Sequence, residues 1–419
     1  MDAAGMQSLW RFLRRAAQDE RRNLVSDAAA SLSVQEDPSV LLELADLMIE
    51  SSVSFFGMPL GVSANWTINS IAYCIPMATE EPSVIAAASF AAGLLSRAGG
   101  LQAEADEPVM TGQIFFKETE AAEVNAIPGF EQEVGTIVDA ALPGMKRRGG
   151  GFRGLDVHTL PETGIVRVHV YIHVCDAMGA NAVNTAVEKA AAWIETRCSG
   201  TRVMAILSNS ADRRIARASF RMPVSLLRSQ GMGGMEAAER IVLAASIAAE
   251  DPHRAVTHNK GIMNGITALA LATGNDTRGI EAAVHAFAAR EGRYTALSRY
   301  HIEDECLCGS IELPMPIASA GGAAGIHPCA QFSLGLLGRP GAQELACIAA
   351  SLGLAQNLAA LRALVSEGIQ HGHMKLHARR VAYAAGARGA AVQKVADRIW
   401  RENNISTDRA SEVLAGLDI

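Results

Sequence analysis

The sequence predicts an α+β protein that has a mainly helical large domain, a small α/β domain inserted into it and a helical C-terminal segment. Its 419 residues are too many for one simple core and indicate two or three domains. A compact run of strand and helix patterns interrupts helical sequence on both sides, and the end of the chain is helical and rich in alanine and arginine. The predicted division is 1–101 with 213–368 for the large domain, 102–212 for the small domain and 369–419 for the C-terminal segment.

Composition and charge limit the classes of protein and partner. Hydrophobic residues make up 49% of the chain but aromatic residues only 5%, so closely packed helices rich in alanine are expected. The formal net charge is −7 and no basic stripe is evident, which argues against a nucleic-acid partner. The seven cysteines include no CxxC pair and are predicted to be reduced thiols of a cytoplasmic protein. Cys306 and Cys308 are too isolated a pair to predict a zinc site.

No segment is predicted to reach a membrane. The N-terminal stretch is amphipathic and charged, and it lacks the apolar region and the cleavage site of a signal peptide. The longest apolar stretch, 348–365, carries Gln356, Asn357 and Arg362 and is interpreted as a packed helix.

The first hundred residues predict helices and one pair of strands. The segment "NWTINSIAYCIPMA" (65–78) alternates around a short turn, as a strand pair does. A helix then begins in "EEPSV", with Pro82 in its first turn and with Glu80 and Glu81 at the positive end of its dipole.

The small domain is predicted from a clear strand with neighbouring helix and strand patterns. "IVRVHVYIHVC" (165–175) places valines on one face, and His169 and His173 with Arg167 and Tyr171 on the other. The two histidines are interpreted as part of a solvated or partner-covered strand face. The other predicted elements are a strand at 113–117, a helical stretch that ends near 143–154, a turn and helix at 176–198 and a strand at 202–209.

Helices return at 234–251 and 279–291, and two β segments follow within 294–318. Between these helices, Lys260 lies among asparagines and a glycine, which predicts a polar turn before an apolar helix. Asp276 follows in a Gly-Asn-Asp turn. A lysine near an aspartate can hold a positive charge over a developing oxyanion, although most such residues in turns are solvated.

Two glycine turns are candidate ligand sites. In "DAMGANAVN" (176–184) a strand ends and a helix begins, and free N–H groups at a helix N-terminus favour a phosphate. The segment lacks GxGxxG, so it does not predict a Rossmann site, and an ordinary turn capped by Asp176 is the alternative. In "ASAGGAAGIHP" (318–328) the backbone can approach a ligand closely, or the segment is a simple loop.

Three histidines lie close together in "EGIQHGHMKLHARR" (367–380). On a helix, His373 and His377 share one face, a spacing that suits a metal. However, no carboxylate is adjacent, and Lys375 and Arg379 would repel a dication. Surface histidines and a proton-transfer residue remain the alternatives.

Five segments together resemble the bacterial class II 3-hydroxy-3-methylglutaryl-CoA (HMG-CoA) reductases. They are "MATEEPSV", "DAMGANAVNT", "THNKGIMNGI", "ATGND" and "GIQHGHMKLHAR", in the order and spacing of that family. The resemblance covers nearly the whole chain. It implies an NAD(P)-dependent oxidoreductase that interconverts HMG-CoA with mevalonate and CoA through mevaldehyde, by two hydride transfers. It also implies a ferredoxin-like, non-Rossmann small domain that binds the cofactor and a C-terminal flap.

The resemblance assigns four catalytic residues. Glu81 matches the catalytic acid and Lys260 the catalytic lysine. Asp276 matches the aspartate that hydrogen-bonds both, and His373 matches the histidine that protonates the departing CoA thiolate. His371 matches no function, His377 is at most a neighbouring contact, and no metal is implied.

The resemblance also assigns binding residues. The cofactor-binding turn is matched by Asp176, Ala177, Met178, Gly179, Ala180 and Asn181, and the HMG pocket by Ser83, Arg254, Asn209 and Asn264. Asp139 is a candidate ribose partner that favours NADH, whereas the neighbouring Lys146, Arg147 and Arg148 could pair with the 2′-phosphate of NADPH.

Two departures from the family pattern keep other functions open. Ser51 replaces the usual asparagine, and "AGGAA" (320–324) lacks the usual hydroxyl group. The alternatives are a reductase of a different acyl-CoA thioester and a non-catalytic protein that binds CoA or a nucleotide. The resemblance further implies a homodimer, or an assembly of dimers, with sites built across the interface.

Overall fold

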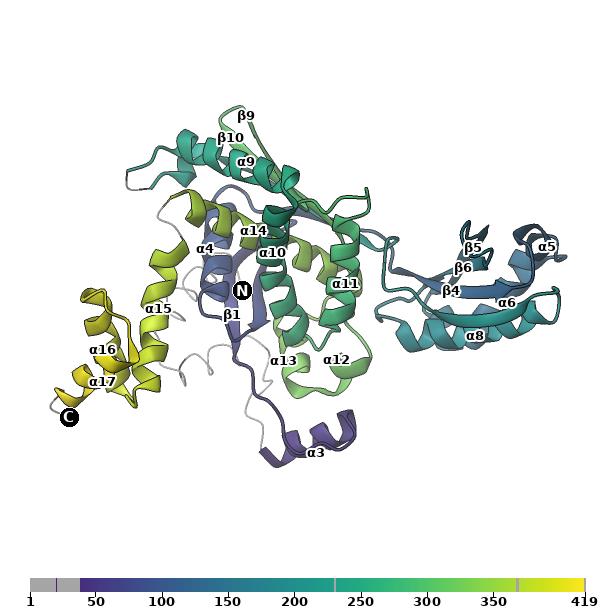
Figure 1. The fold of residues 1–419 in the computed structure, drawn as a ribbon, viewed down its shortest axis with the longest axis horizontal. Coiled ribbons are helices and arrows are strands. Elements are labelled where there is room, and N and C mark those ends of the chain that lie inside the picture. The colour runs from purple at the N-terminus through teal and green to yellow at the C-terminus, as the bar shows by residue number, and fades with distance from the viewer. Residues whose placement is uncertain (1–19, 21–37, 230, 367–368, 418–419) are drawn as a thin grey trace.

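The computed structural model describes residues 38–229, 231–366 and 369–417, together with Glu20. A large central body lies between a small α/β body and a group of short C-terminal helices (Figure 1). All the paired strands of the three sheets run antiparallel, and helices pack against the sheets. The mixed helix-and-sheet class predicted from the sequence is confirmed.

Two long helices form the centre of the large body. These are α10 (Pro252–Ala272) and α14 (Ala342–Val365). They approach closely at glycines, since a Cβ atom on Gly353 would lie 2.8 Å from Ile266 Cδ1. By length and composition alone α14 could cross a membrane, but 72% of its apolar window is buried inside the protein. This burial agrees with the packed helix expected from the sequence.

A hairpin and a helix pack against this centre. β1 (Leu60–Ile68) and β2 (Ile71–Ala78) form the strand pair predicted between 65 and 78, and α4 (Val84–Arg97) follows. Trp66, Ile75 and Met77 of the hairpin are fully or almost fully buried in the large core.

The large body also contains a four-stranded sheet in the order β3-β8-β10-β9. Its strands are β3 (Gln102–Ala105), β8 (Ile215–Pro223), β9 (Ser298–Glu303) and β10 (Cys306–Pro314). Ala216, Ala218 and Phe220 of β8 are buried in the core, so the alternating Arg217 and Ser219 lie on the opposite, open face. Strand β3 pairs with β8 although it lies within the span 102–212.

The small body has the element order β-α-β-β-α-β and the strand order β5-β6-β4-β7. Its elements are β4 (Val109–Lys117), α5 (Ala121–Asn125), α6 (Phe130–Ala141), α7 (Pro143–Arg147), β5 (Gly151–Thr159), β6 (Val166–His173), α8 (Ala180–Glu195) and β7 (Thr201–Leu207). The valines of β6 are buried as the alternating pattern predicts. Helix α8 lies so close to β4 that a Cβ on Gly112 would be 2.3 Å from Val187 Cγ1.

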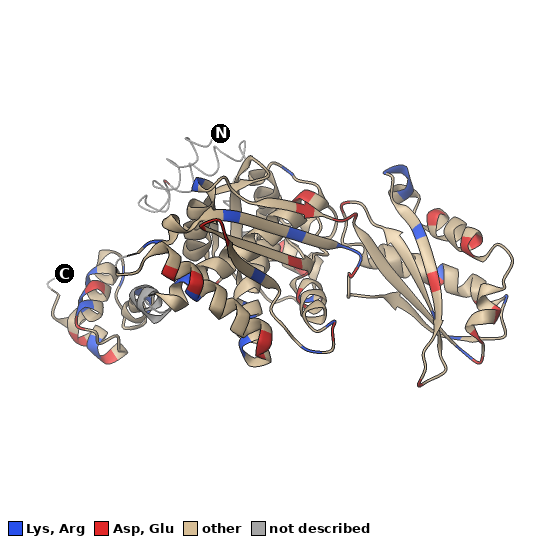
Figure 2. Cartoon of the chain, turned by 90° about the horizontal axis from the view of Figure 1, so that it is seen from above, with Lys and Arg blue, Asp and Glu red and all other residues tan. Residues whose placement is uncertain are grey.

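The remaining helices surround these bodies. They are α3 (Pro38–Met48), a 3₁₀ turn (Val224–Leu227), α9 (Gly234–Glu250), α11 (Thr277–Ala288), α12 (Gly322–Ile326), α13 (Pro328–Leu336), α15 (Ile369–Ala384), α16 (Ala390–Arg401) and α17 (Thr407–Ala415). The last three share a small core of their own. Figure 2 shows basic and acidic residues interspersed on these helices and on the large sheet, with no long stripe of one sign in this view.

Three details differ from the sequence predictions. Lys260 lies in the middle of α10 and not in a turn, because Asp251 caps the helix, Pro252 begins it, and Gly261 and Gly265 are accommodated within it. The helical stretch ends at Arg147, within the predicted 143–154, but residues 151–159 form a strand, β5, that the sequence did not predict. Asp176 does not cap α8, whose N-cap is Gly179. The seven cysteines are free thiols, as predicted.

Candidate active site

A carboxylate and an ammonium group meet between two elements of the large body. Glu81 lies in the turn between β2 and α4, and Lys260 lies on α10. Lys260 Nζ is 3.4 Å from Glu81 Oε2. The Lys260 side chain is 62% exposed and that of Glu81 35%, so the pair faces an accessible space and is not sealed in the core.

This pair lines a cavity of about 170 Å³. Asn264 lies one helical turn after Lys260 and lines the same cavity, as helical spacing requires. Glu281 of α11 is a further carboxylate in the lining, and its Oε1 accepts a hydrogen bond of 2.9 Å from Thr267 Oγ1. Sequence reasoning missed Glu281 because no pattern in the chain brings α11 next to α10.

Three predicted substrate residues, Ser83, Arg254 and Asn209, lie outside the lining of this cavity. Ser83 is the N-cap of α4 in the left-handed conformation, at φ 79°, beside the Glu81 turn. Arg254 lies in the first turns of α10 and is half-buried. Among the described residues its guanidinium makes no hydrogen bond or ion pair, so it is available to an anionic ligand.

The segment just before Lys260 is fixed by a buried polar network. His258 shares a hydrogen bond of 2.6 Å with Ser298 Oγ, which also bonds Asn357 Oδ1. Asn259 donates to the Thr295 carbonyl and accepts from the Leu297 amide. Burial, and then the positive charge of nearby Arg254, lowers the pKa of His258 to about 4. The network therefore contains a neutral His258 and fixes the part of α10 that carries Lys260.

Asp276 lies in a second cluster, separate from the cavity lining. It caps α11 by accepting hydrogen bonds from the amides of Arg278 and Gly279, and it pairs with the Arg278 side chain at 3.2 Å. A Cβ on Gly279 would lie within 3.4 Å of Asp276, Asn209 and Met178. Asp276 is thus close to the predicted cofactor turn and not hydrogen-bonded to Lys260 or Glu81.

The predicted cofactor turn leads from β6 into α8. Gly179 has φ 97°, and a Cβ there would lie 2.5 Å from Val174 Cγ1, so the turn requires glycine. No side chain caps α8, which leaves the first N–H groups of a 16-residue helix for an anion.

The two groups proposed to choose between cofactors lie beside this turn. Asp139 accepts a hydrogen bond from the Phe152 amide and pairs with Lys146 at 2.5 Å. The Cys175 thiol, next to the turn, contacts the carbonyl oxygen of Arg148. The Arg147 and Arg148 side chains are exposed and form no ion pair within the described part of the chain.

The three C-terminal histidines are only partly described. The side chains of His371 and His373 lie outside the described residues, although both positions belong to α15. His377 is exposed. Seven residues after His373, the Arg380 guanidinium donates a hydrogen bond to the carbonyl oxygen of Glu80. This bond joins α15 to the turn that carries Glu81.

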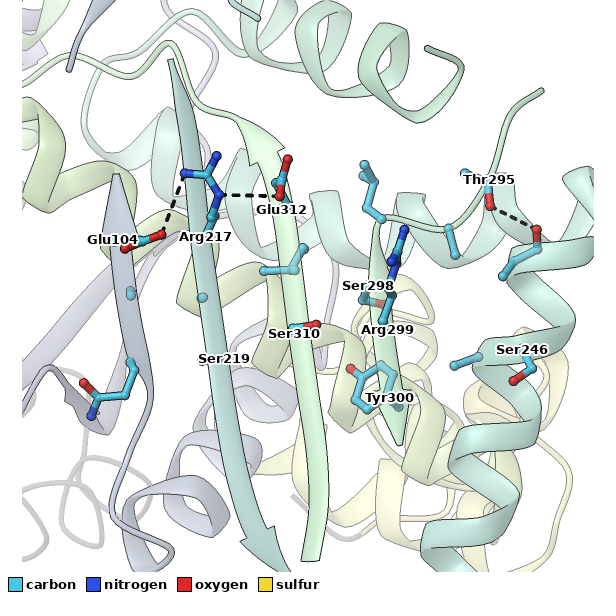
Figure 3. A pocket seen from close by; sticks show the side chains of 18 of the residues that line it. Glu104, Arg217, Ser219, Ser246, Thr295, Ser298, Arg299, Tyr300, Ser310 and Glu312 are labelled. Atoms are coloured by element: carbon cyan, nitrogen blue, oxygen red, sulfur yellow. Dashed lines mark hydrogen bonds and ion pairs between the residues drawn. The ribbon is translucent and has the colours of Figure 1, made fainter. Parts of the chain in front are cut away.

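Two other features lie on the large sheet. A cavity of about 890 Å³ lies over the open face of the large sheet, where Arg217 pairs with Glu104 and Glu312 (Figure 3). At the end of that face, His301, Glu303 and Cys308 form a possible ligand cluster for a metal. Arg221 already bonds Glu303 at 2.9 Å, and its positive charge opposes a dication there.

The described geometry defines a class of protein. A carboxyl–ammonium pair in an open cavity suits proton transfer to, and charge stabilisation on, a carbonyl oxygen. An uncapped helix after a buried strand suits a phosphate-bearing ligand. Together they are typical of an enzyme that acts on a carbonyl compound with a nucleotide cofactor.

Comparison with known proteins identifies the family. The model of the hydroxymethylglutaryl-coenzyme A reductase family matches residues 17–378. The 3-hydroxy-3-methylglutaryl-coenzyme A reductase of Archaeoglobus fulgidus is 44% identical over 95% of this chain and 92% of the relative. The chain belongs to the hydroxymethylglutaryl-coenzyme A reductase family and is therefore an oxidoreductase.

Solved structures agree with this membership. A class II 3-hydroxy-3-methylglutaryl-CoA reductase from Streptococcus pneumoniae, bound to NADPH in open conformations, is 39% identical, with a TM-score of 0.80 over 85% of this chain and 100% of that one. A second structure of the Streptococcus pneumoniae reductase is 38% identical and has the same TM-score over 97% and 99% of the two chains. The resemblance recognised from the five segments is confirmed.

Proposed function

We propose that this chain reduces HMG-CoA to mevalonate and CoA through enzyme-bound mevaldehyde, with NADH or NADPH as the cofactor. The single observation that supports this assignment best is the contact between Glu81 and Lys260 in an open cavity. The contact joins a proton donor to a cation at one place, and reduction of a thioester requires both.

Lys260 stabilises negative charge in this proposal. Attack on the thioester carbonyl produces an oxyanion, and the Lys260 ammonium lies on the cavity wall with Asn264 one turn away. A hydrogen-bond donor already positioned at such an oxygen lowers the activation free energy by about 3 kcal/mol or more in comparable sites. The fixed helix beneath Lys260 keeps this charge in place without reorganisation.

Glu81 and His373 move protons in this proposal. The hemithioacetal collapses to mevaldehyde and a CoA thiolate, which His373 protonates. Glu81 then gives a proton to the aldehyde oxygen as the alcohol forms. Asp276 adjusts the protonation of Lys260 and Glu81.

The chain can hold a nicotinamide dinucleotide at the start of α8. The uncapped helix N-terminus and the Cβ-free Gly179 fit a phosphate group. We assign Asp176, Ala177, Met178, Gly179, Ala180 and Asn181 to this site, in a ferredoxin-like small domain of residues 102–212. When bound, the dinucleotide supplies the hydride for each reduction step. Asp139 can accept from a ribose hydroxyl, whereas Arg147 and Arg148 can pair with a 2′-phosphate.

HMG-CoA itself is assigned to the large domain, residues 1–101 and 213–368. We assign Arg254, which forms no ion pair in the described part of the chain, to its carboxylate, and Ser83, Asn209 and Asn264 to the surrounding pocket. The segment 369–419 acts as a flap, held in this conformation by the bond from Arg380 to Glu80.

The active unit in this proposal is a homodimer, or an assembly of dimers. Asp276 and Lys260 lie in different clusters of one protomer, so the Asp276 cluster of one protomer would meet the Lys260 cavity of the other. Exposed apolar side chains near the start of the described chain suit such an interface, namely Leu42, Leu47, Ile49, Val53 and Phe56. Ser51, with φ 57°, lies among them.

Cofactor oxidation by the purified protein tests this function. The loss of nicotinamide absorbance is followed with HMG-CoA, with NADH and NADPH in parallel, and mevalonate and free thiol are measured at the end. Two cofactors oxidised per mevalonate support the proposal, and the ratio of rates decides between the Asp139 and arginine interpretations. Folded dimeric protein that oxidises neither cofactor, or that prefers another acyl-CoA, would contradict it.

A further inference from the structure

Four segments that are distant in sequence meet beside the proposed cofactor turn, and a buried arginine lies at their junction. Arg214, in the segment that connects β7 to β8, is only 3% exposed. Its Nη1 donates to the carbonyl oxygen of Ala177 at 3.1 Å, and its Nη2 donates to the carbonyl oxygen of Ile317. One guanidinium therefore joins the turn after β6 to the loop after β10.

Asp176 strengthens the same junction from the side of the turn. Its Oδ1 accepts a hydrogen bond of 2.8 Å from the Ala342 amide, at the first residue of α14. Its carbonyl oxygen accepts from the amides of Ser319 and Ala320, at 3.0 and 3.1 Å. The carboxylate of Asp176 partly offsets the burial that lowers the pKa of Arg214 to about 10, so the guanidinium stays charged at neutral pH.

The loop that Arg214 contacts also holds the turn that carries Asp276. Asn275 Nδ2 donates to the Ala318 carbonyl at 2.9 Å, and its Oδ1 accepts from the Ala318 amide at 2.7 Å. Gly274 has φ 69°, and a Cβ there would lie 2.9 Å from the Ala324 amide nitrogen. The loop 317–324 is therefore a common support for the Asp276 turn and the cofactor turn.

We propose that Arg214 is a positioning residue for dinucleotide binding, which fixes the start of α8 relative to Asp276 by joining Ala177 to Ile317. This inference rests on the proposed function, because it takes the turn at 176–181 as the cofactor site. Arg214 acts through the backbone that it bonds. Without it, every residue of the turn remains but the turn must be ordered when the ligand binds, which lowers affinity.

The chemistry of the guanidinium explains why arginine is required. Its planar fork can donate to two carbonyl oxygens in fixed directions at once, whereas a lysine presents one compact ammonium on a flexible stem. Arg214→Lys therefore keeps the buried charge beside Asp176 but holds only one of the two segments firmly. Arg214→Met removes both bonds and leaves Asp176 without the facing charge.

The test is a fluorescence titration with NADH and with NADPH, without HMG-CoA, on full-length protein. Arg213→Met is the matched control, because the neighbouring Arg213 is exposed and lies over the Tyr171 ring at 3.6 Å. Arg214→Lys is expected to raise the dissociation constant on the order of tenfold and Arg214→Met up to about a hundredfold. The control should change it by less than about twofold.

A second readout separates positioning from general damage. In Arg214→Lys, the KM for the dinucleotide should rise with its dissociation constant, while the KM for HMG-CoA stays at the wild-type value. Equal rises of both KM values, or a folded Arg214→Lys protein that binds dinucleotide as tightly as wild type, would overturn the proposal. Arg214→Lys decides alone if Arg214→Met does not fold. Wild-type protein that binds no dinucleotide would instead contradict the proposed function.

Discussion

Lys260 Nζ lies 3.4 Å from Glu81 Oε2, although 179 positions separate the two residues in the chain. The local structure around either residue does not determine this contact. The contact exists because α10 packs against the hairpin β1–β2 and because the Glu81 turn follows directly after β2. The charge pair is thus a product of the large core, and its two members can be tested separately from the fold.

Lys260→Ala should abolish most turnover without loss of structure. The side chain is 62% exposed, so its removal leaves no cavity in the core. We expect kcat to fall on the order of a hundredfold or more, which corresponds to about 3 kcal/mol of transition-state stabilisation. Steady-state kinetics and circular dichroism measure the two effects. A variant that keeps the full rate would contradict this mechanism.

Glu81→Gln should be far more harmful than the same change at Glu80. Both side chains line the cavity, but only Glu81 contacts Lys260. Glutamine keeps the shape of Glu81 and removes the proton, so kcat should fall on the order of a hundredfold or more. Glu80→Gln should change kcat by less than about threefold. Similar losses in the two variants would show that the cavity tolerates no change and would leave Glu81 without a special role.

Gly179→Ala should weaken dinucleotide binding at least about tenfold and lower the melting temperature. The new Cβ would lie 2.5 Å from Val174 Cγ1, at a backbone φ of 97°. The left-handed conformation alone costs roughly 1–2 kcal/mol. Gly164→Ala is the control, since φ is 68° there and the Cβ meets nothing within 4 Å. If both variants bind dinucleotide normally, the turn at Gly179 is not the cofactor site.

Much of the fold was accessible from local patterns. The strand β6 and the hairpin were predicted because residue types alternate along their sequences; burial follows this alternation over much of β6, whereas residues 73–77 of β2 are all buried. Strand β8 was missed because two of its buried positions are alanines that alternate with arginine and serine, a weak hydrophobic signal. Lys260 was placed in a turn because asparagine and glycine surround it, but Gly265 packs closely on Leu352 of α14, and a Cβ at Gly261 would meet nothing within 4 Å, so neither glycine marks a turn.

The assembly of the site could not be predicted in the same way. The five motifs named Glu81, Lys260 and Asp276 through a family resemblance, but no local pattern shows that Asp276 lies beside Asn209 and Met178 and not beside Lys260. Glu281 and Arg214 carry no motif at all. Their roles depend on contacts between elements far apart in sequence, which only tertiary packing creates.

The stability of the protein should fall on the acid side partly because of His258. Its pKa is lowered to about 4 in the folded state, against an ordinary value of about 6.5. The folded state therefore binds this proton less readily than the unfolded state. The contribution is complete above about pH 6.5 and is lost progressively as the pH falls toward 4, to a total of about 3 kcal/mol.

Comparison with His258→Gln isolates this contribution. Glutamine can still bond Ser298 but does not titrate. Urea unfolding at several pH values should show a smaller loss of stability between pH 6.5 and 4 in the variant than in wild type. Parallel pH profiles for the two proteins would mean that His258 does not carry the acid sensitivity.

Arg380→Ala should slow turnover while cofactor binding stays unchanged. Arg380 donates to the Glu80 carbonyl oxygen and so holds α15 against the turn that presents Glu81. Without this bond the helix that carries His373 is held less firmly, and thiolate protonation becomes less frequent because it requires the helix in place. We expect kcat to fall about three- to tenfold, since a typical hydrogen bond contributes roughly 1 kcal/mol net. The adjacent Arg379→Ala removes the same charge from the helix without this contact and should have a smaller effect.

Reduction of added mevaldehyde by Arg380→Ala is a second measurement. If this rate equals that of wild type, the defect lies before the second reduction. An equal loss in both variants would show that the charge of α15, and not its contact with Glu80, matters.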